Sequence, residues 1–289
     1  MSSGERARGH SIQPPVRLSA LLVGVLVAMA AANVWPPLLL NLGALPGAII
    51  EITFLAGFIW WAQGGGPPKA MHAARIKAFR RVGLSPREML WGVIAALSFA
   101  ATVHASIVLL FRFILYSTAA FRQGYDLSFI PSQAMRWLAV VISAASAAVC
   151  EETGFRGLLQ QPIESRYSVP VAVFTSSLLF TALHLTKSWA LLGMVPIVFG
   201  AGILLGLIAW SAQSLIPGMI GHFVMDVGLF AYWWTGIVGE FPQHPINETG
   251  VDRSFVITSC TFVTSLMIVL IAILKLRQKQ QFLSKGVSQ

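Results

Sequence analysis

The sequence predicts an all-α fold, a polytopic bundle of about eight transmembrane helices. Of its 289 residues, 56% are hydrophobic and only 11% are charged, whereas soluble domains carry roughly 25% charged residues. The mean hydropathy is correspondingly high, at +0.72. The apolar residues also gather into stretches near the ~20 residues that a helix needs to cross a hydrocarbon core ~30 Å thick. Water is therefore not the main solvent of this chain.

The predicted spans follow one another through short loops. They cover residues 18–35, 45–62, 89–116, 134–160, 168–186, 191–211, 214–235 and 254–274. The first is too long, and too soon followed by the second, for a cleaved signal peptide. We divide the chain into a cytoplasmic amino-terminal tail (1–17), the first three spans (18–133), a core (134–235), and a last part (236–289) with an outer loop, the final span and a basic tail.

The distribution of Lys and Arg predicts that both termini are cytoplasmic. With eight spans, fifteen of the 20 cations fall on the side of the termini. The other five are Arg112, Arg122, Arg136, Lys187 and Arg253. This bias follows the positive-inside rule, so the net charge of +9 indicates a lipid bilayer as partner and no nucleic acid. The basic loop 63–87 opens with three glycines and two prolines, which predicts a hinge into an interfacial segment attracted to anionic lipid.

Four of the eleven acidic residues fall within apolar runs. They are Glu51, Glu151, Glu152 and Asp226. Each charge at mid-depth costs about 2.5 to 3.5 kcal/mol on insertion scales, so such residues favour a functional hypothesis. Glu51 lies near the outer end of its span, where we expect it to reach the interface.

The first cluster is Cys150-Glu151-Glu152-Thr153-Gly154-Phe155-Arg156-Gly157, three ionisable groups in an apolar helix. Glu152 and Arg156 have i,i+4 spacing and share a face, so we expect an ion pair between them. Glu151 points about 100° away from that face. We therefore expect Glu151 to face a cavity as a general base, with an ion-pair staple between helices as the alternative.

Two further clusters lie in later spans. Phe180 precedes His184 by one helical turn, so its ring can limit the rotamers of the imidazole. His222 and Asp226 also have i,i+4 spacing, so Asp226 can accept from one ring nitrogen and leave the other aimed into the bundle. A structural His–Asp clip is the alternative for that pair. His104 has no aromatic or acidic partner at this spacing, and we expect it to make a hydrogen bond between helices.

Depth in the membrane gives a partial test of whether these clusters meet. If spans four and five form a hairpin turning near Tyr167, Glu151 and His184 lie at one level, about 24 Å from the turn. His222 lies only about 13 Å from its own turn. The three clusters can meet only if the hairpin of spans four and five extends beyond the membrane surface, or if the helices tilt.

The three motifs, EETGFRG, FTALH and HFVMD, in this order on successive spans, resemble the CPBP family. This family includes the CAAX prenyl endopeptidases and the bacteriocin self-immunity, Abi-like proteins. Its pattern is E-E-x-x-x-R, then F-x-x-x-H, then H-x-x-x-N or D. The resemblance covers roughly residues 134–235, which we therefore treat as a CPBP-like catalytic core.

The resemblance implies a catalytic role for each matching residue. Glu151 and His184 would activate a water, while His222 and Asp226 would hold the substrate carbonyl or its oxyanion. Glu152 and Arg156 would support the first carboxylate, and Phe180 would support His184. The prenyl endopeptidases have Asn where this chain has Asp226. An ionised Asp cannot donate to an oxyanion, so Asp226 is either protonated or orients His222.

We expect a metal-independent mechanism without a cofactor, because H-E-x-x-H is absent and Glu151 with His184 suffices to activate water. The alternative is a zinc site formed by Glu151, His184 and His222.

The resulting functional hypothesis is an intramembrane endopeptidase, a hydrolase that acts on a membrane protein or lipidated peptide. CAAX-type processing is one form of this activity. The first alternative is a non-catalytic membrane adaptor or bacteriocin-immunity protein that keeps the motifs as a scaffold. The second is a proton-coupled transporter, which predicts duplicated, broken helices, and the sequence has no such repeat.

Overall fold

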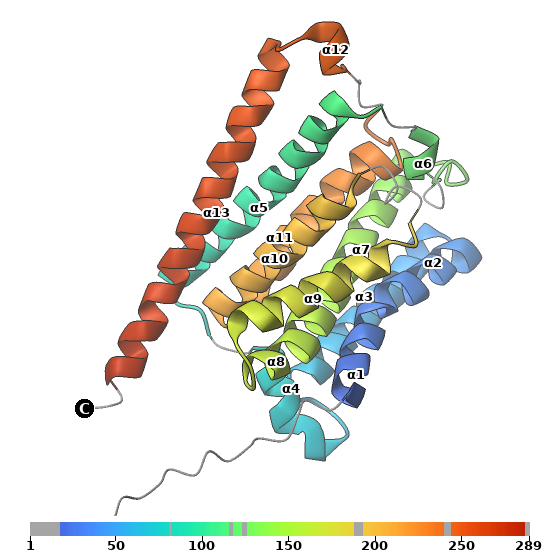
Figure 1. Ribbon diagram of the computed structural model, residues 1–289. Coiled ribbons are helices and arrows are strands. Elements are labelled where there is room, and N and C mark those ends of the chain that lie inside the picture. The colour runs from blue at the N-terminus through green and yellow to red at the C-terminus, as the bar shows by residue number, and fades with distance from the viewer. Residues whose placement is uncertain are drawn as a thin grey trace, which may run out of the picture.

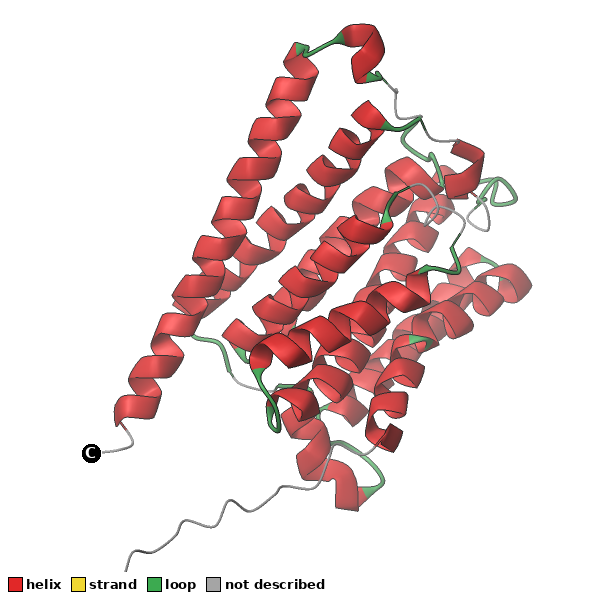
Figure 2. Ribbon diagram, viewed as in Figure 1, coloured by secondary structure: helices red, strands yellow, loops and turns green. Residues whose placement is uncertain are grey.

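The computed structural model describes residues 18–80, 83–115, 118–122, 126–187, 193–239 and 244–286. Throughout these residues the regular structure is helical, without strands, which confirms the predicted all-α class (Figure 2). The predicted amino-terminal tail, residues 1–17, lies outside the described residues.

The helices overlap the predicted spans, although the first observed apolar segment reaches Leu42 where the prediction ended at residue 35. Within the described residues, six helical segments are long and apolar enough to cross a membrane, namely Leu21–Leu42, Ala44–Ala62, Pro86–Phe113, Gln133–Glu164, Val195–Ala212 and Arg253–Gln278. A shorter apolar helix covers Val169–His184. Ile216–Leu229, continued by Phe230–Trp234, fills the remaining predicted position. About eight spans is therefore compatible with the structure.

The elements run in the following order. The helices are α1 (Leu18–Ala28), α2 (Ala30–Leu42), α3 (Ala44–Ala62), α4 (His72–Ala78), α5 (Pro86–Phe113), α6 (Thr118–Arg122), α7 (Gln133–Glu151), α8 (Gln161–Glu164), α9 (Val169–His184), α10 (Val195–Ala212), α11 (Ile216–Leu229), α12 (Ile246–Thr249) and α13 (Arg253–Gly286). Two π-helical segments, η2 (Glu152–Gln160) and η4 (Phe230–Trp234), continue α7 and α11, and η1 (Lys69–Met71) is a 3₁₀ turn.

The bundle has two distinct ends (Figure 1). One end holds α4, α8 and the carboxyl-terminal end of α13, and we call it the basic end. The opposite end holds α6 and α12, and we call it the α6 end. The long helices run between these ends, so each loop can be assigned to one of them.

The apolar core gathers around α5, which packs against α10, α11 and α13. Phe99 and Ile107 of α5 and Leu205 of α10 are fully buried there. A side-chain hydrogen bond of 2.9 Å from Thr102 to Ser265 links α5 to α13. Lipid tails are as apolar as the outer surfaces of the helices, so apolar contact alone does little to hold the helices together. Hydrogen bonds between helices therefore contribute to the stability of the bundle.

Small residues allow close helix contacts beside the core. A Cβ on Gly202 would lie 3.0 Å from the Cβ of Ser177, and one on Gly206 would lie 2.8 Å from Oε1 of Gln160. The G-x-x-x-G pair of α10 is therefore used for packing inside the bundle.

The basic loop 63–87 folds back onto the protein more than its composition predicts. Arg75 is buried and donates to five backbone carbonyls, those of Trp61, Gly64, Gly65, Gly66 and Pro68. Arg80 is also buried. Lys69 and Lys77 remain exposed. Only part of the loop's positive charge is thus presented at the surface.

The expectation that Glu51 reaches the interface is wrong. Its side chain is fully buried, and Ser146 of α7 donates a hydrogen bond of 2.5 Å to Oε1. The physical reason is that α3 packs against α7 along the face that carries Glu51, so the carboxyl points into the bundle.

Candidate active site

The first cluster lies where α7 changes from an α-helix to a π-helix. Glu151 ends α7, and η2 begins at Glu152. π-Helical segments are rare and occur frequently at functional sites. Gly154 within η2 lies against the backbone of α1, where a Cβ would approach the carbonyl oxygen of Gly24 to 2.4 Å. Close packing against α1 therefore accompanies the widened helix.

Glu152 is the centre of a buried ionic network. Its Oε1 lies 3.0 Å from Nη1 of Arg156, so the expected i,i+4 ion pair is present. Arg156 also donates to the carbonyl of Gly202 at 3.2 Å, and its guanidinium lies 4.6 Å from the centre of the Phe180 ring. Both charged side chains are completely buried. Complete burial makes each charged partner dependent on the other.

His222 has a different hydrogen-bond partner from the one its spacing predicts. Its Nδ1 lies 2.9 Å from Oε1 of Glu152, at hydrogen-bond distance. Asp226 faces the other nitrogen, with Oδ2 3.5 Å from Nε2, and Oε2 of Glu151 lies 3.9 Å from the same nitrogen. The i,i+4 rule considers one helix at a time, so it missed a partner on η2.

His184 is held in one tautomer by its own helix. Its Nδ1 lies 2.8 Å from the carbonyl oxygen of Phe180, and a carbonyl can only accept. The proton of the neutral ring is therefore on Nδ1, and Nε2 carries the lone pair. The Phe180 ring packs against the imidazole with ring centres 4.5 Å apart, as the i,i+4 spacing predicts. His184 is thereby set to accept a proton at Nε2.

The residues of all three motifs meet at one cavity of about 850 Å³. Its walls include Glu151, Phe180, His184, His222 and Asp226. Glu152 and Arg156 are buried behind this surface. The side chain of Glu151 is 19% exposed and lines the cavity, while its buried Oε2 has no hydrogen-bond partner among the described residues. Its carboxylate is thus available to a molecule in the cavity.

The three motifs meet at one depth because the hairpin of η2, α8 and α9 extends farther than the turn between α10 and α11. A Cβ on Gly157 of η2 would lie 3.4 Å from Leu215, which directly precedes α11. The turn between α10 and α11 therefore lies level with Gly157, and the chain of η2 and α8 continues beyond it to Glu164. This offset brings His222 to the level of Glu152.

Several polar residues at or near the site were not predicted. Lys187, Asp126 and Thr235 line the cavity from loops, and Glu51 with Ser146 forms a buried pair nearby. A Lys only three residues after the His184 motif is the one signal that could have indicated Lys187. The expectation for His104 is confirmed, because its Nε2 lies 3.1 Å from the backbone carbonyl of Met225.

Within the described part of the chain, no three His, Cys, Asp or Glu residues are arranged to hold a metal ion. The alternative zinc set of Glu151, His184 and His222 lines the cavity without forming such a group. Both the metal-independent mechanism and the zinc alternative stay predictions.

The fold and the site together define a polytopic membrane protein with an acid–histidine cluster inside a helical bundle. Residues 132–228 match the model of a protein family described as type II CAAX prenyl endopeptidase Rce1-like. The matched segment contains all three motifs, so the resemblance to the CPBP family is confirmed over this part of the chain. No curated protein and no solved structure matches the chain.

Proposed function

We propose that this protein is an intramembrane endopeptidase that hydrolyses a peptide bond of a membrane protein or membrane-bound peptide. The observation that carries the proposal is that Glu151, His184 and His222, from three helices, line one cavity within the bundle. The match of residues 132–228 to a family of prenyl endopeptidases supports a protease as well.

Glu151 and His184 are the proposed bases for the attacking water. The carboxylate of Glu151, which lines the cavity, takes one proton from the water, while Nε2 of His184 accepts a hydrogen bond from the second O–H of the water. The water oxygen then forms a bond to the carbonyl carbon of the substrate. Glu151 returns its proton to the amide nitrogen as the C–N bond breaks, which yields an amine and a carboxylic acid. The proton of that acid passes to Nε2 of His184, which leaves the carboxylate product.

His222 is the proposed donor to the oxyanion. Glu152 accepts from Nδ1, so a proton on Nε2 makes the ring an imidazolium with a carboxylate on each side. In the transition state, Nε2–H donates to the carbonyl oxygen as negative charge develops there. Asp226 orients this nitrogen in the resting site, which gives the acidic side chain a role that does not require it to donate.

The test is hydrolysis of membrane peptides by the purified protein in liposomes. The peptides are internally quenched transmembrane segments, with and without a farnesylated carboxyl-terminal cysteine. We expect Glu151→Gln and His184→Ala each to lower kcat by about 10²- to 10⁴-fold, because general acid–base catalysis contributes on this order. Glu248→Gln, an exposed residue on α12, is the matched control and should retain full activity.

The same assay separates the alternatives. Activity that persists after treatment with a zinc chelator supports the metal-independent mechanism, and activity that disappears and returns with added zinc supports the zinc alternative. A folded Glu151→Gln variant that cleaves as fast as the wild type would contradict the proposed function. A non-catalytic adaptor predicts no cleavage in any of the samples.

We further propose that the basic end faces the cytoplasm. Among the described residues, the exposed cations Lys69, Lys77, Arg87, Arg166, Lys275 and Arg277 lie toward this end of the bundle. At the α6 end, Arg112, Arg122, Arg136 and Lys187 are buried or half-buried, and Arg253 is exposed. Exposed positive charge is retained on the cytoplasmic side, which supports this orientation.

A further inference from the structure

α11 carries two residues of the proposed active site, His222 and Asp226, and packs against both α5 and α7. On the side of the site, Nδ1 of His222 lies at hydrogen-bond distance from Glu152 of η2. That bond orients the imidazole, but the depth of α11 in the bundle also depends on its contacts with α5. These contacts therefore influence where Nε2 of His222 lies in the cavity.

Small residues bring the backbones of α5 and α11 close together. A Cβ on Gly92 of α5 would lie 2.8 Å from Cγ of Pro217. A Cβ on Gly221 of α11 would lie 3.1 Å from Cα of Ala96. The residue numbers rise along both helices from the first pair to the second, so the two helices run parallel. Small residues permit such close approach between membrane helices, and here they fit α11 closely against α5.

His104 makes a further contact with α11, farther along α5. Its Nε2 lies 3.1 Å from the carbonyl oxygen of Met225. A carbonyl can only accept, so Nε2 carries a hydrogen and donates it. Gly228 makes room for the ring, because a Cβ there would lie 2.4 Å from Nε2 and 2.6 Å from Cε1 of His104. The imidazole therefore lies directly against the backbone of α11.

The carbonyl that accepts from His104 belongs to the peptide bond between Met225 and Asp226. Both of these residues line the cavity, and His222 lies one turn earlier on the same helix. Val103, the residue before His104, also lines the cavity, whereas His104 is turned toward α11. The hydrogen bond from His104 therefore holds α11 from behind, at the level of the site.

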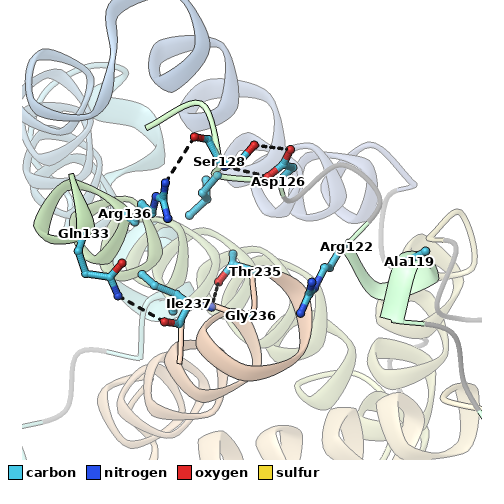
Figure 3. A pocket seen from close by; sticks show the side chains of 10 residues that line it. Ala119, Arg122, Asp126, Ser128, Gln133, Arg136, Thr235, Gly236 and Ile237 are labelled. Atoms are coloured by element: carbon cyan, nitrogen blue, oxygen red, sulfur yellow. Dashed lines mark hydrogen bonds between the residues drawn. The ribbon is translucent and has the colours of Figure 1, made fainter. Parts of the chain in front are cut away.

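Contacts at the α6 end hold α11 less directly. There, Gln133 of α7 donates to the carbonyl of Ile237 at 3.3 Å (Figure 3). This hydrogen bond is exposed, and the π-helical segment η4 lies between it and Asp226. Hydrogen bonds inside a protein are electrostatically stronger than those in water. The bond from His104, inside the bundle, is therefore the stronger constraint on the depth of α11 at the site.

The site is sensitive to this depth because His222 faces groups on another segment. Its Nε2 lies 3.9 Å from Oε2 of Glu151, and its Nδ1 lies 2.9 Å from Oε1 of Glu152. Asp226 moves together with His222 because both belong to α11, but the two glutamates do not. A displacement of about 1 Å can lower the rate of an enzyme about 100-fold.

We propose that His104 is a positioning residue: its hydrogen bond to the Met225 carbonyl sets the depth of α11 and places Nε2 of His222 where the substrate's oxyanion forms. This inference rests on the proposed function, in which His222 donates to that oxyanion. His104 contacts neither the substrate nor the attacking water. It acts through the backbone of α11, so another side chain that donates from the same place should replace it.

The first test replaces His104 and uses the peptide assay described above. His104→Leu removes the donor, and we expect kcat to fall about 10- to 100-fold while KM stays within about threefold of the wild-type value. His104→Gln keeps an N–H donor at the end of the side chain, and its kcat should stay within about threefold of the wild-type value. Failure of His104→Gln to restore kcat would contradict a role through this hydrogen bond.

Thr102→Val is the matched control for lost helix packing. Thr102 also belongs to α5, and its hydrogen bond of 2.9 Å joins Ser265 of α13, on the side away from α11. We expect Thr102→Val and His104→Leu to lower Tm by similar amounts in detergent, but Thr102→Val should keep the wild-type kcat. Equal losses of kcat in the two variants would reveal a merely structural role of His104 and would overturn the inference.

A double-mutant cycle tests whether His104 acts through His222. His222→Asn keeps an N–H near the position of Nδ1 but lacks Nε2, so we expect kcat to fall about 100- to 1000-fold. In this background, His104→Leu should lower kcat by less than about threefold, because residues that act through one another are not additive. The same fold-loss from His104→Leu in both backgrounds would overturn the inference.

Gly228→Ala gives a second test in a chain that keeps His104, and it decides the question if His104→Leu does not fold. The new methyl group would displace the imidazole from the Met225 carbonyl, so kcat should fall as in His104→Leu. Gly200→Ala on α10, where a Cβ meets nothing within 4 Å, is the matched control.

The failure of this inference differs from the failure of the proposed function. Cleavage that depends on Glu151 but is unchanged in His104→Leu and Gly228→Ala would reject the inference alone. Cleavage that survives Glu151→Gln would reject the proposed function.

Discussion

Two adjacent glutamates, Glu151 and Glu152, have opposite surroundings. Glu152 is fully buried between Arg156 and His222, which lie 3.0 and 2.9 Å from its Oε1. The side chain of Glu151 is 19% exposed at the cavity, and its Oε2 has no hydrogen-bond partner among the described residues. One carboxylate is therefore part of the interior structure, and the other is available for chemistry.

Glu152→Gln should destabilise the protein more than it alters the cavity surface. The substitution leaves the buried guanidinium of Arg156 without its counter-charge, and breaking a buried pair costs about 3 to 5 kcal/mol. Thermal unfolding in detergent should therefore show a marked fall in Tm. Glu151→Gln should keep the wild-type Tm while losing activity. Equal Tm values for Glu152→Gln and the wild type would mean that the network contributes little to stability.

The π-helical segment η2 gives the site its shape. A regular helix through residues 134–160 was predicted, and the observed chain changes its hydrogen bonding at Glu152. After such a change, the residues that follow point in other directions than a 3.6-residue period implies. Gly24 and Gly154 let α1 pack directly on this segment.

Gly154→Ala tests this contact. The new methyl group would lie 2.4 Å from the carbonyl oxygen of Gly24, so α1 must move away from η2. Overpacking of this kind costs about 1 to 3 kcal/mol, and we expect a lower Tm together with lower activity. Gly57→Ala is the matched control, because a Cβ there meets nothing within 4 Å. A Gly154→Ala variant as stable as Gly57→Ala would show that α1 can shift at no cost.

The start of α13 should depend on pH through Asp252. The backbone N–H of Phe255 donates to Asp252 at 2.7 Å, and Arg112 of α5 lies 3.0 Å from the carboxylate. These contacts, the backbone hydrogen bond first, lower the pKa of Asp252 from 3.8. The stabilisation is therefore complete above about pH 4 and is lost as the pH falls through the lowered pKa.

Hydrogen exchange measures this effect. Amides in the first turn of α13 should lose protection at pH 3 relative to pH 6, after correction for intrinsic rates. Asp252→Asn should show the low protection at both pH values. The same loss between pH 6 and pH 3 in Asp252→Asn would assign the change to another group.

The whole bundle is asymmetric between its two ends. Asp126, Lys187 and Thr235 line the cavity of Glu151 at the α6 end, whereas Arg80 and the Glu152–Arg156 pair lie between Glu151 and the basic end. Arg80 is 4% exposed and also contacts the carbonyl of Ala209, at 3.5 Å. A single side chain thus joins the segment after α4 to η2, α8 and α10.

Arg80→Ala should therefore destabilise the basic end of the bundle. Loss of this side chain leaves Glu164 without its partner and creates a space between four segments, so we expect a lower Tm. Lys77→Ala, which removes an exposed cation of the same segment, should keep the wild-type Tm. A Tm of Arg80→Ala equal to that of the wild type would show that the contacts of Arg80 contribute little to stability.

Composition and periodicity were enough to predict the helical class, the approximate positions of the spans and the buried charged residues of the motifs. These features depend on local chemistry, namely the length of apolar runs and i,i+4 spacing along one helix. The Glu152–Arg156 pair and the Phe180–His184 contact follow from i,i+4 spacing along one helix. The structural role of His104 was predicted because no motif residue accompanies it in its span.

The packing of distant segments settled the rest. The hydrogen bond between Glu152 and His222, the burial of Glu51 against Ser146 and the inward turn of Arg80 join residues that are far apart in the chain. The π-helical segment and the depth of the α10–α11 turn set the level at which the motifs meet. No spacing rule along one helix contains this information, because it depends on how far each helix extends beside its neighbours.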